Sequence, residues 1–419
     1  MKITSESRLI WKFSLAVIVL ICFNTAFAQT SYRVTDLGAL HDGVFGCAMG
    51  LNNKGWTESM DGFLDASGNF RGRAVINVSG LKIDLGTLGG PDSWINWGGI
   101  NEQGEAVGLA ETSVPDPDGE DFCAFGTGLT CRPFIWQNGD MKALPTLGGN
   151  NGQASAINNR GQIVGQAQTK VTDSGCPPYQ TALPALWGKG KVKQLPTVEG
   201  DPDGYAIGIN DSGQAVGASG ICSAPFTVPL HAVLWDNGTP VELPNLGNAS
   251  NNQAVAINNQ GQIVGQSSSP DGTTFYAVLW QNGTITNLGT LPGDFASYAT
   301  GINNKGQVVG STTDSNFNPS HAFIWENGVM TDLNTVLPAN SNLYATMANK
   351  INSRGQISGM ATVLSGPDAG NIHSFLATPV DASIGESIAA VAVQHPKATM
   401  PTNVRKQLLQ RLGVSRLGQ

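Results

Sequence analysis

The segment AINNRGQIVGQ, from Ala156 to Gln166, recurs almost unchanged as AINNQGQIVGQ from Ala256 to Gln266. Its core, Ile or Leu followed by Asn and, three residues later, by Gly, occurs seven times, with the glycines at Gly55, Gly104, Gly161, Gly213, Gly261, Gly306 and Gly355. Successive glycines are 45 to 57 residues apart (306 − 261 and 161 − 104), a period typical of propeller blades and longer than that of most helical solenoids. A catalytic site needs its residues once, so seven copies indicate that this motif specifies the fold.

The copy from Ala296 to Val336 shows how one unit is built. Two short β-compatible runs, YATGIN and GQVVGS, flank Asn304-Lys305-Gly306, where we expect Asn and Gly to supply the backbone conformations of a tight hairpin. HAFIW and VMTDLNTV follow, joined by a turn at Asn327-Gly328, the strongest short hairpin signal. Each unit is therefore predicted to be a four-stranded antiparallel sheet.

The third strand of each unit is apolar without alternation, as in PFIW, PALW, AVLW and AFIW. Such a strand must be covered on both faces. Sheets that stack against a neighbour on either side, as blades do around a propeller axis, provide that cover.

The fourth-strand motif, seen for instance as ITNLGTL from Ile285, decides between a ring and an open stack. The last unit lacks it, whereas the chain opens with an unassigned copy, YRVTDLGAL, from Tyr32 to Leu40. This segment would complete the last sheet if the chain closes on itself. We therefore predict an all-β, seven-bladed β-propeller over residues 31–380, with the last blade closed by the N-terminal strand; a β-solenoid or open repeat array is the alternative.

These motifs, INNxGQxVG, AFxW.NG and DLGTLGG, resemble the HAF family of extracellular repeats, named for the HAF that stands here at His321 to Phe323. The resemblance covers most of the chain and implies secretion and a repeat architecture. It transfers no catalytic residue. The first unit departs from the pattern, because LNNKGWTESM replaces the second strand and Asn77 replaces the tryptophan.

The two ends of the chain read differently from the repeats. A basic start, the apolar run Phe13 to Phe23 and a small-residue site at Ala26 to Ala28 predict a secretory signal peptide over residues 1–28. We thus expect a secreted protein, extracellular or periplasmic, with the repeats over residues 29–380 and no transmembrane segment after cleavage. Residues 381–419 are expected to form a tail with a short basic amphipathic helix, in which Val404, Leu408 and Leu412 would share a face.

Composition and cysteine placement narrow the function classes. The chain is acidic, with a net charge of −8, and has no basic cluster in its repeats, which argues against nucleic acid as a partner. In a compartment that permits disulfides we expect the pairs Cys123–Cys131, within one loop, and Cys176–Cys222, between equivalent loops of adjacent units. Cys47 is expected to be a buried, inert thiol.

Candidate binding residues lie in the connections from second to third strand, where the sequence varies most and where rigid scaffolds commonly carry function. The longest such loop holds Asp116, Asp118, Glu120 and Asp121, a set of oxygen ligands that suits calcium, although a solvated acidic loop is the simpler interpretation. Phe122, Tyr179 and Phe226 could stack on a sugar or peptide, or cover the loop's own core. Apart from calcium, no cofactor is predicted.

Catalytic signatures are missing from the sequence. There is no HExxH, GxSxG or GxxxxGK[ST]. His231, His321 and His373 precede the third strands of different units, so they would lie around a ring and not converge. We therefore expect a non-catalytic protein that binds or scaffolds a glycan, peptide or envelope partner. The alternatives are a propeller enzyme of the glycan hydrolase or lyase type, with carboxylates near the axis, and a purely structural extracellular protein.

Overall fold

The computed structural model of the chain describes residues 30–43, 45–172, 180–220, 230–248 and 251–380. The predicted signal peptide, the C-terminal tail and the candidates Cys176, Tyr179, Cys222 and Phe226 lie outside these residues. The protein is all-β, with 60% strand and 2% helix, which confirms the all-β class of the predicted fold. Within the described ranges, no helix combines the length and hydrophobicity that crossing a membrane requires.

The strands follow one another in antiparallel groups. The first strands of the groups are β2 (Phe45–Leu51), β6 (Gly89–Ile100), β10 (Gly152–Ile157), β14 (Asp203–Ile209), β18 (Asn252–Ile257), β22 (Ala296–Ile302) and β26 (Leu343–Ile351). The second strands are β3 (Thr57–Leu64), β7 (Ala106–Pro115), β11 (Ile163–Thr172), β15 (Ala215–Gly220), β19 (Ile263–Ser268), β23 (Val308–Thr313) and β27 (Ile357–Val363). The third strands are β4 (Phe70–Val78), β8 (Leu129–Gln137), β12 (Gln180–Gly188), β16 (Leu230–Asp236), β20 (Phe275–Gln281), β24 (Pro319–Glu326) and β28 (Ile372–Val380). The fourth strands are β5 (Leu81–Asp84), β9 (Asp140–Ala143), β13 (Lys191–Gln194), β17 (Thr239–Glu242), β21 (Thr284–Gly289) and β25 (Val329–Asp332).

Five of the sheets contain four strands in chain order, for example β10-β11-β12-β13, which confirms the predicted four-stranded antiparallel unit. The remaining sheet has eight strands, because a single parallel bridge between Phe45 and Ile372 joins β26-β27-β28 to β2-β3-β4-β5. The eighth strand, β1 (Ser31–Gly38), pairs antiparallel with β28, from Ser31 opposite Val380 to Gly38 opposite Ser374. Two short 3-10 helices, η1 (Leu40–Asp42) and η2 (Leu333–Val336), precede β2 and β26.

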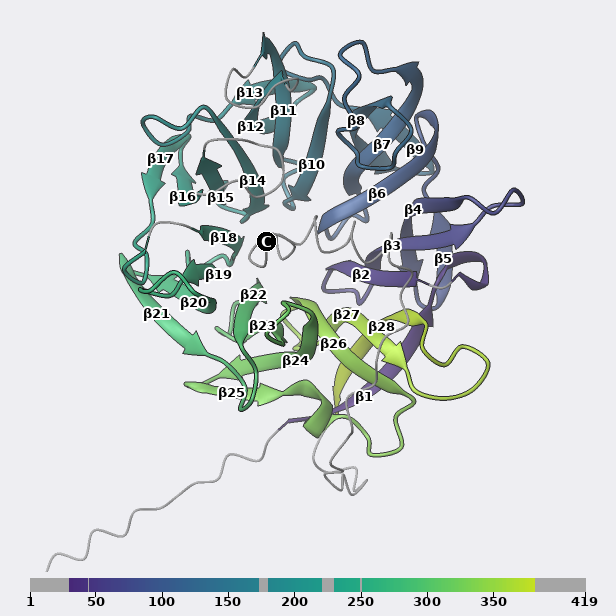
Figure 1. Ribbon diagram of the computed structural model, residues 1–419, viewed down its shortest axis with the longest axis vertical. Helices are drawn as coiled ribbons and strands as arrows, with labels where there is room; N and C mark the ends of the chain where they lie inside the picture. The colour runs from purple at the N-terminus through teal and green to yellow at the C-terminus, as the bar shows by residue number, and fades with distance from the viewer. Residues whose placement is uncertain (1–29, 44, 173–179, 221–229, 249–250, 381–419) are drawn as a thin grey trace, which may run out of the picture.

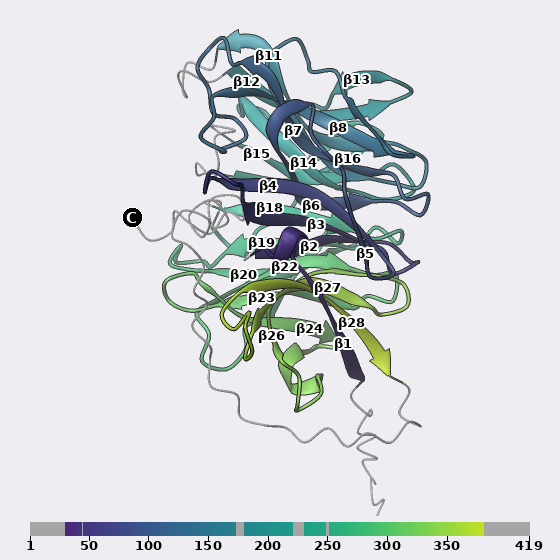
Figure 2. The ribbon, with the colours of Figure 1, turned by 90° about the vertical axis from the view of Figure 1, so that its right-hand side faces the viewer.

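The sheets lie around a common centre, with the first strands nearest to it and the fourth strands at the periphery (Figure 1). Figure 2 shows the same sheets from the side. Because the strands are antiparallel, the turns between first and second and between third and fourth strands share one end of each sheet, which we call the turn end. The connections from second to third strand and onward to the next group share the other end, the loop end.

The turns between third and fourth strands have the predicted chemistry. Asn138, Asn237, Asn282 and Asn327 have φ values of 51° to 54°, and each precedes a glycine with positive φ. Two successive left-handed residues are what a two-residue hairpin turn requires. Asn and Gly reach this conformation at the lowest steric cost, which explains why the pair recurs.

The third strands form the core, as their apolar sequence predicts. In β16, Ala232, Val233 and Trp235 are each at most 1% exposed. The tryptophans also tie adjacent sheets together, because the indole N–H donates to a proline carbonyl of the preceding group: Trp187 to Pro145, Trp235 to Pro196 and Trp280 to Pro244, at 2.6–2.7 Å. The Trp of one unit and the Leu-Pro of the unit before it are thus two halves of one contact.

The first unit forms a sheet in spite of its divergent sequence. Its strands β3 and β4 pair over eight residues, from Thr57 opposite Asn77 to Leu64 opposite Phe70. Asn77, which stands where other units have tryptophan, is 5% exposed and accepts a hydrogen bond from the Gly80 N–H at 2.9 Å. The amide side chain therefore caps the following turn and does not pack as an apolar residue would.

Candidate functional site

The repeated asparagine closes the first turn of each unit through its side chain. In the sixth copy, Asn303 Oδ1 accepts from the N–H groups of Lys305 and Gln307, at 2.9 and 3.1 Å. Only Gly306 of the following residues has a left-handed backbone, with φ of 78°. The prediction that Asn304 and Gly306 both supply special backbone conformations is therefore half wrong, because the preceding asparagine acts through an Asx-type turn.

The same asparagines also connect neighbouring repeats. Asn303 Nδ2 donates to Gln307 Oε1 at 2.7 Å and to the Asn352 carbonyl at 3.1 Å. The series of Nδ2-to-carbonyl bonds, at 3.0–3.4 Å, runs Asn52 to Asn101, Asn101 to Asn158, Asn158 to Asn210, Asn210 to Asn258, Asn258 to Asn303, Asn303 to Asn352 and Asn352 back to Asn52. One side chain therefore both shapes a turn and binds the next repeat.

The residue after each asparagine lines a hollow at the turn end, which we call the axial cavity. Its volume is about 200 Å³. All seven repeats contribute the same three positions to its wall: an Ile or Leu, the buried asparagine and the residue that follows. These following residues, which we call the rim, are Asn53, Glu102, Asn159, Asp211, Asn259, Asn304 and Ser353. Sequence reasoning placed candidate sites at the loop end and missed this cavity.

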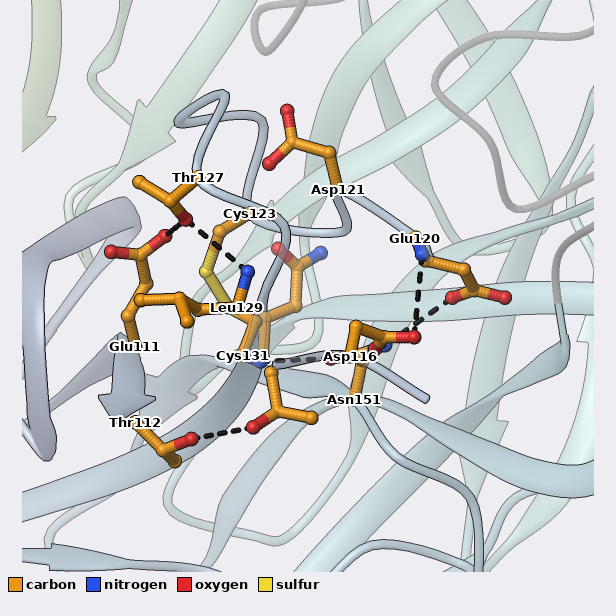
Figure 3. Close-up of a disulfide and its surroundings, with 12 residues drawn as sticks. Glu111, Thr112, Asp116, Glu120, Asp121, Cys123, Thr127, Leu129, Cys131 and Asn151 are labelled. Carbon is orange, nitrogen blue, oxygen red and sulfur yellow. Dashed lines mark hydrogen bonds between the residues drawn. A yellow bond between two sulfur atoms is a disulfide. The ribbon is translucent and has the colours of Figure 1, made fainter. Parts of the chain in front are cut away.

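The acidic loop between β7 and β8 is held by amide donors. Asp116 is 7% exposed and Glu120 is 1% exposed, and the Asn151 side-chain amide donates to both, at 2.7 and 3.2 Å (Figure 3). Gln168 Nε2 and the Gln180 N–H also donate to Glu120, at 2.5 and 2.8 Å. Burial raises the pKa of Glu120, and these donors act against that rise. The two carboxylates therefore fix the loop to the neighbouring sheet.

The calcium hypothesis gains no geometric support at this loop. Asp118 accepts from Asn150 Nδ2 at 2.7 Å, and Asp121 accepts from the Gly126 N–H. In the part of the chain that the structure describes, no group of three or more His, Cys, Asp or Glu side chains could hold a metal ion. Calcium stays a prediction, and the four carboxylates have a demonstrated role as acceptors for loop and sheet N–H groups.

Phe122, the described member of the predicted aromatic set, covers the core of its own loop. It is partly buried and packs, with Phe125, against the cluster that contains Trp94. A ring in that position contributes apolar contacts inside the protein. Of the two roles predicted for Phe122, it therefore has the structural one, covering the core of its own loop.

The loop also contains the predicted disulfide between Cys123 and Cys131, whose sulfurs are drawn in Figure 3. Both cysteines are at most 2% exposed. The predicted partner pair, Cys176–Cys222, lies outside the described residues. Cys47 is buried and free, and burial raises the pKa of its thiol to about 12, which agrees with an inert thiol.

Replacing both Cys123 and Cys131 by alanine is expected to lower the free energy of unfolding by about 2.5 kcal/mol, because the bridge closes a short loop in the unfolded chain. The sequence separation of the pair is 8 residues. Urea unfolding of the double variant against wild type checks this value. A Cys47→Ala variant, which leaves the bridge intact, controls for loss of buried sulfur. A double variant as stable as wild type would contradict the prediction.

The histidines pair with aspartates in three separate sheets. His231 Nδ1 lies 2.7 Å from Asp201, His321 Nδ1 lies 2.7 Å from Asp294, and His373 Nδ1 lies 3.0 Å from Asp36. Burial lowers the pKa of His321, but Asp294 outweighs it and the net pKa is raised. Ser219 Oγ donates to the same Asp201 carboxylate that His231 contacts, at 2.6 Å. In a hydrolytic triad the serine bonds to the histidine, so this set resembles one in composition only.

Two buried carboxyl groups lack a full set of hydrogen bonds. Glu58 is completely buried; its Oε2 accepts from the Gly99 N–H at 2.6 Å, while Oε1 has no partner. Burial raises the pKa of Glu58 to about 8, although the positive charge of Lys350 acts to lower it. Burial also lowers the pKa of Lys350. Glu111 accepts from Thr127 Oγ1, leaves Oε2 without a partner, and has its pKa raised by burial to about 7.

Comparisons with known proteins find similar sequences and structures, but they do not identify an activity for this chain. A family of proteins of unknown function, DUF3466, matches residues 204–374. No curated protein matches the chain. Among solved structures, the β-propeller domain of the Trilobed protease from Pyrococcus furiosus is 8% identical with a TM-score of 0.46, and the match covers 80% of this chain and 95% of that one. Pyrococcus horikoshii acylaminoacyl peptidase is 11% identical with a TM-score of 0.47, covering 80% of this chain and 52% of the peptidase.

Proposed function

We propose that this chain is a secreted, non-catalytic seven-bladed propeller that binds or scaffolds a partner through its loop end. The seven asparagine bonds, which return from Asn352 to Asn52, support a closed ring of blades. The pairing of β1 with β28 supports closure of the last blade by the N-terminal strand. Secretion and membership of the HAF family rest on the sequence motifs alone.

The observation that carries the binding role is a set of exposed apolar side chains at the loop end. Leu64, Val114, Val171 and Leu364 are 62%, 56%, 65% and 38% exposed. They lie at or next to the loop ends of β3, β7, β11 and β27, the second strands of four consecutive units when the last is followed by the first. Contiguous exposed apolar surface marks interaction sites, and equivalent positions in neighbouring units would bring these four side chains to one face of the protein.

The charge of the loop end restricts the classes of partner that it can bind. Its described connections contain acidic residues, among them Asp118, Asp314 and Asp368, and no lysine or arginine; the basic residues Arg71, which pairs with Asp65, and Lys170 stand at the adjoining strand ends. Connections at the turn end, by contrast, include Lys54, Arg160 and other basic residues. A surface with an excess of negative charge repels anionic ligands. We therefore favour a neutral glycan or a basic peptide or envelope component over an anionic polysaccharide.

A thermal-shift screen of residues 29–419 tests this proposal. The probes are neutral and anionic polysaccharides, peptidoglycan fragments, basic peptides, calcium and EDTA. A ligand that binds only the folded state adds about 2.7 kcal/mol of stability at a hundred times its dissociation constant. We expect one neutral or basic class to raise the melting temperature.

Matched variants separate the loop end from exposed apolar surface in general. The variant Leu64→Ser, Val114→Thr, Val171→Thr, Leu364→Ser should abolish the shift. The control, Leu81→Ser with Val329→Thr, changes residues that are 66% and 62% exposed on fourth strands and should preserve it. A shift that survives in the first variant, or no shift with any probe, would contradict binding through the loop end.

A further inference from the structure

The axial cavity is a separate site, because it lies at the turn end, opposite the proposed loop-end surface. Each repeat contributes its Ile or Leu, its buried asparagine and its rim residue. At about 200 Å³ the cavity suits one compact group, since sites for drug-sized ligands enclose roughly 300–1,000 Å³.

The rim is already organised by hydrogen bonds. Six of its seven members accept, through a side-chain oxygen, the backbone N–H of the rim residue in the preceding repeat, at 2.8–3.0 Å. The Asx turns below them hold the backbone. A ligand would therefore meet a preformed wall, which lowers the entropic cost of binding.

The rim carries two negative charges, and the positive charge of Arg160, in the neighbouring turn, acts on one of them, Asp211. Glu102 and Asp211 are its two charged members, and neither is in an ion pair within the described residues. Burial raises the pKa of Asp211, but hydrogen bonds from Asn159 and Asn259, at 3.0 and 3.1 Å, outweigh it and hold the pKa below the usual value. One oxygen of Glu102 accepts from the Asn53 N–H at 2.8 Å. Both carboxylates keep lone pairs that can accept from a ligand.

We propose that the axial cavity binds an organic cation, namely a primary ammonium or guanidinium group on an aliphatic stem. The carboxylates of Glu102 and Asp211 would accept its N–H groups in charge-assisted hydrogen bonds. The isoleucine and leucine side chains that share the lining would contact the stem. A bare metal ion fits less well, because six of the seven rim side chains already accept a backbone N–H and only two of the rim side chains are carboxylates.

This cation chemistry has three sources: a free amine, a basic side chain of a partner, or the chain's own C-terminal tail. The tail holds Arg405, Lys406, Arg411 and Arg416. It follows Val380, where β28 ends at the turn end. Truncation after Val380 distinguishes the tail from the external sources, and a lysine-rich peptide compared with butylammonium distinguishes the other two.

Isothermal titration of residues 29–419 with butylammonium and butylguanidinium, at low ionic strength, tests the proposal. We expect both cations to bind, 1-butanol not to bind, and the double variant Glu102→Gln, Asp211→Asn to weaken binding at least tenfold. The variant should fold, because asparagine already occupies the rim positions of Asn159, Asn259 and Asn304. Circular dichroism and the melting temperature check this.

Glu105→Gln is the matched control, because Glu105 lies in the same turn as Glu102 but outside the cavity lining, with Oε2 bound to Asn101 Nδ2 at 2.6 Å. It should bind both cations as wild type does. Tighter binding after truncation would identify the tail as a competing occupant. Equal binding of 1-butanol, no binding by either the full or the truncated chain, or equal loss in Glu105→Gln would overturn the proposal. None of these results depends on the loop-end surface.

Discussion

Replacing Asn303 by alanine is expected to destabilise the protein by about 3 kcal/mol. Its side chain makes four hydrogen bonds: two accepted from Lys305 and Gln307 N–H groups, and two donated, to Gln307 Oε1 and the Asn352 carbonyl. Asn303 is 4% exposed, so water cannot replace these partners in the folded variant. Each buried hydrogen bond contributes about 1 kcal/mol, and a partner left unsatisfied costs more. We expect the lost stability to come both from the hydrogen bonds within the turn and from the hydrogen bond between repeats.

Urea unfolding of Asn303→Ala and Asn304→Ala, side by side, measures the effect. Asn304 is the next residue, is exposed, and accepts one bond, from the Asn259 N–H at 3.0 Å. Its replacement should therefore cost less than about 1 kcal/mol. If the two variants lose similar amounts, the buried asparagine has no special role in joining repeats. An Asn303→Asp variant, which keeps the acceptor and loses the donor, should fall between alanine and wild type.

The sequence predicted the four-stranded units and the Asn-Gly turns because both depend on interactions between near neighbours in the chain. The turn at Asn327-Gly328, for example, needs only the φ preferences of those two residues. Bonds between repeats were not predictable in the same way. Asn303 and Asn352 are 49 positions apart, and their contact depends on how sheets stack. A usable signal was present, since asparagine recurs in all seven copies while the next residue changes among Asn, Asp, Glu and Ser.

The axial cavity and the buried carboxyl groups lay beyond sequence reasoning for a related reason. Glu102 and Asp211 are ordinary exposed turn residues in isolation, and they share one cavity only because the repeats return to a common centre. In the acidic loop, by contrast, the sequence suggested a site that the tertiary contacts explain in another way. Asp116 and Glu120 have the composition of a calcium site, but the side-chain amide of Asn151, which directly precedes β10 of the next sheet, is their partner. Composition identified the polar residues, and only the tertiary arrangement identified what they bind.

The second large effect concerns pH. Glu58 occupies a second-strand position that holds Val107 and Val164 in the next two units, and it is completely buried. Burial raises its pKa from 4.5 to about 8 in the folded protein, so between these values the folded state holds a proton that the unfolded state has released. The stability that this proton contributes is complete below pH 4.5 and is lost as the pH rises through 8. At about 1.4 kcal/mol per pH unit and proton, the loss over these 3.5 pH units (8 − 4.5) is about 5 kcal/mol.

The variant Glu58→Gln should remove this dependence, because glutamine keeps the acceptor for the Gly99 N–H and cannot ionise. We expect the free energies of unfolding of variant and wild type to agree at pH 5 and to separate by several kcal/mol at pH 8, with the variant more stable. Glu111, whose pKa burial raises to about 7, is common to both proteins, so its contribution cancels in the difference. A Glu58→Gln variant that is less stable than wild type at every pH would contradict the prediction. Such a result would mean that Glu58 is charged in the folded protein and is stabilised by Lys350. The structure argues against a charged Glu58, because its Oε1 has no hydrogen-bond donor.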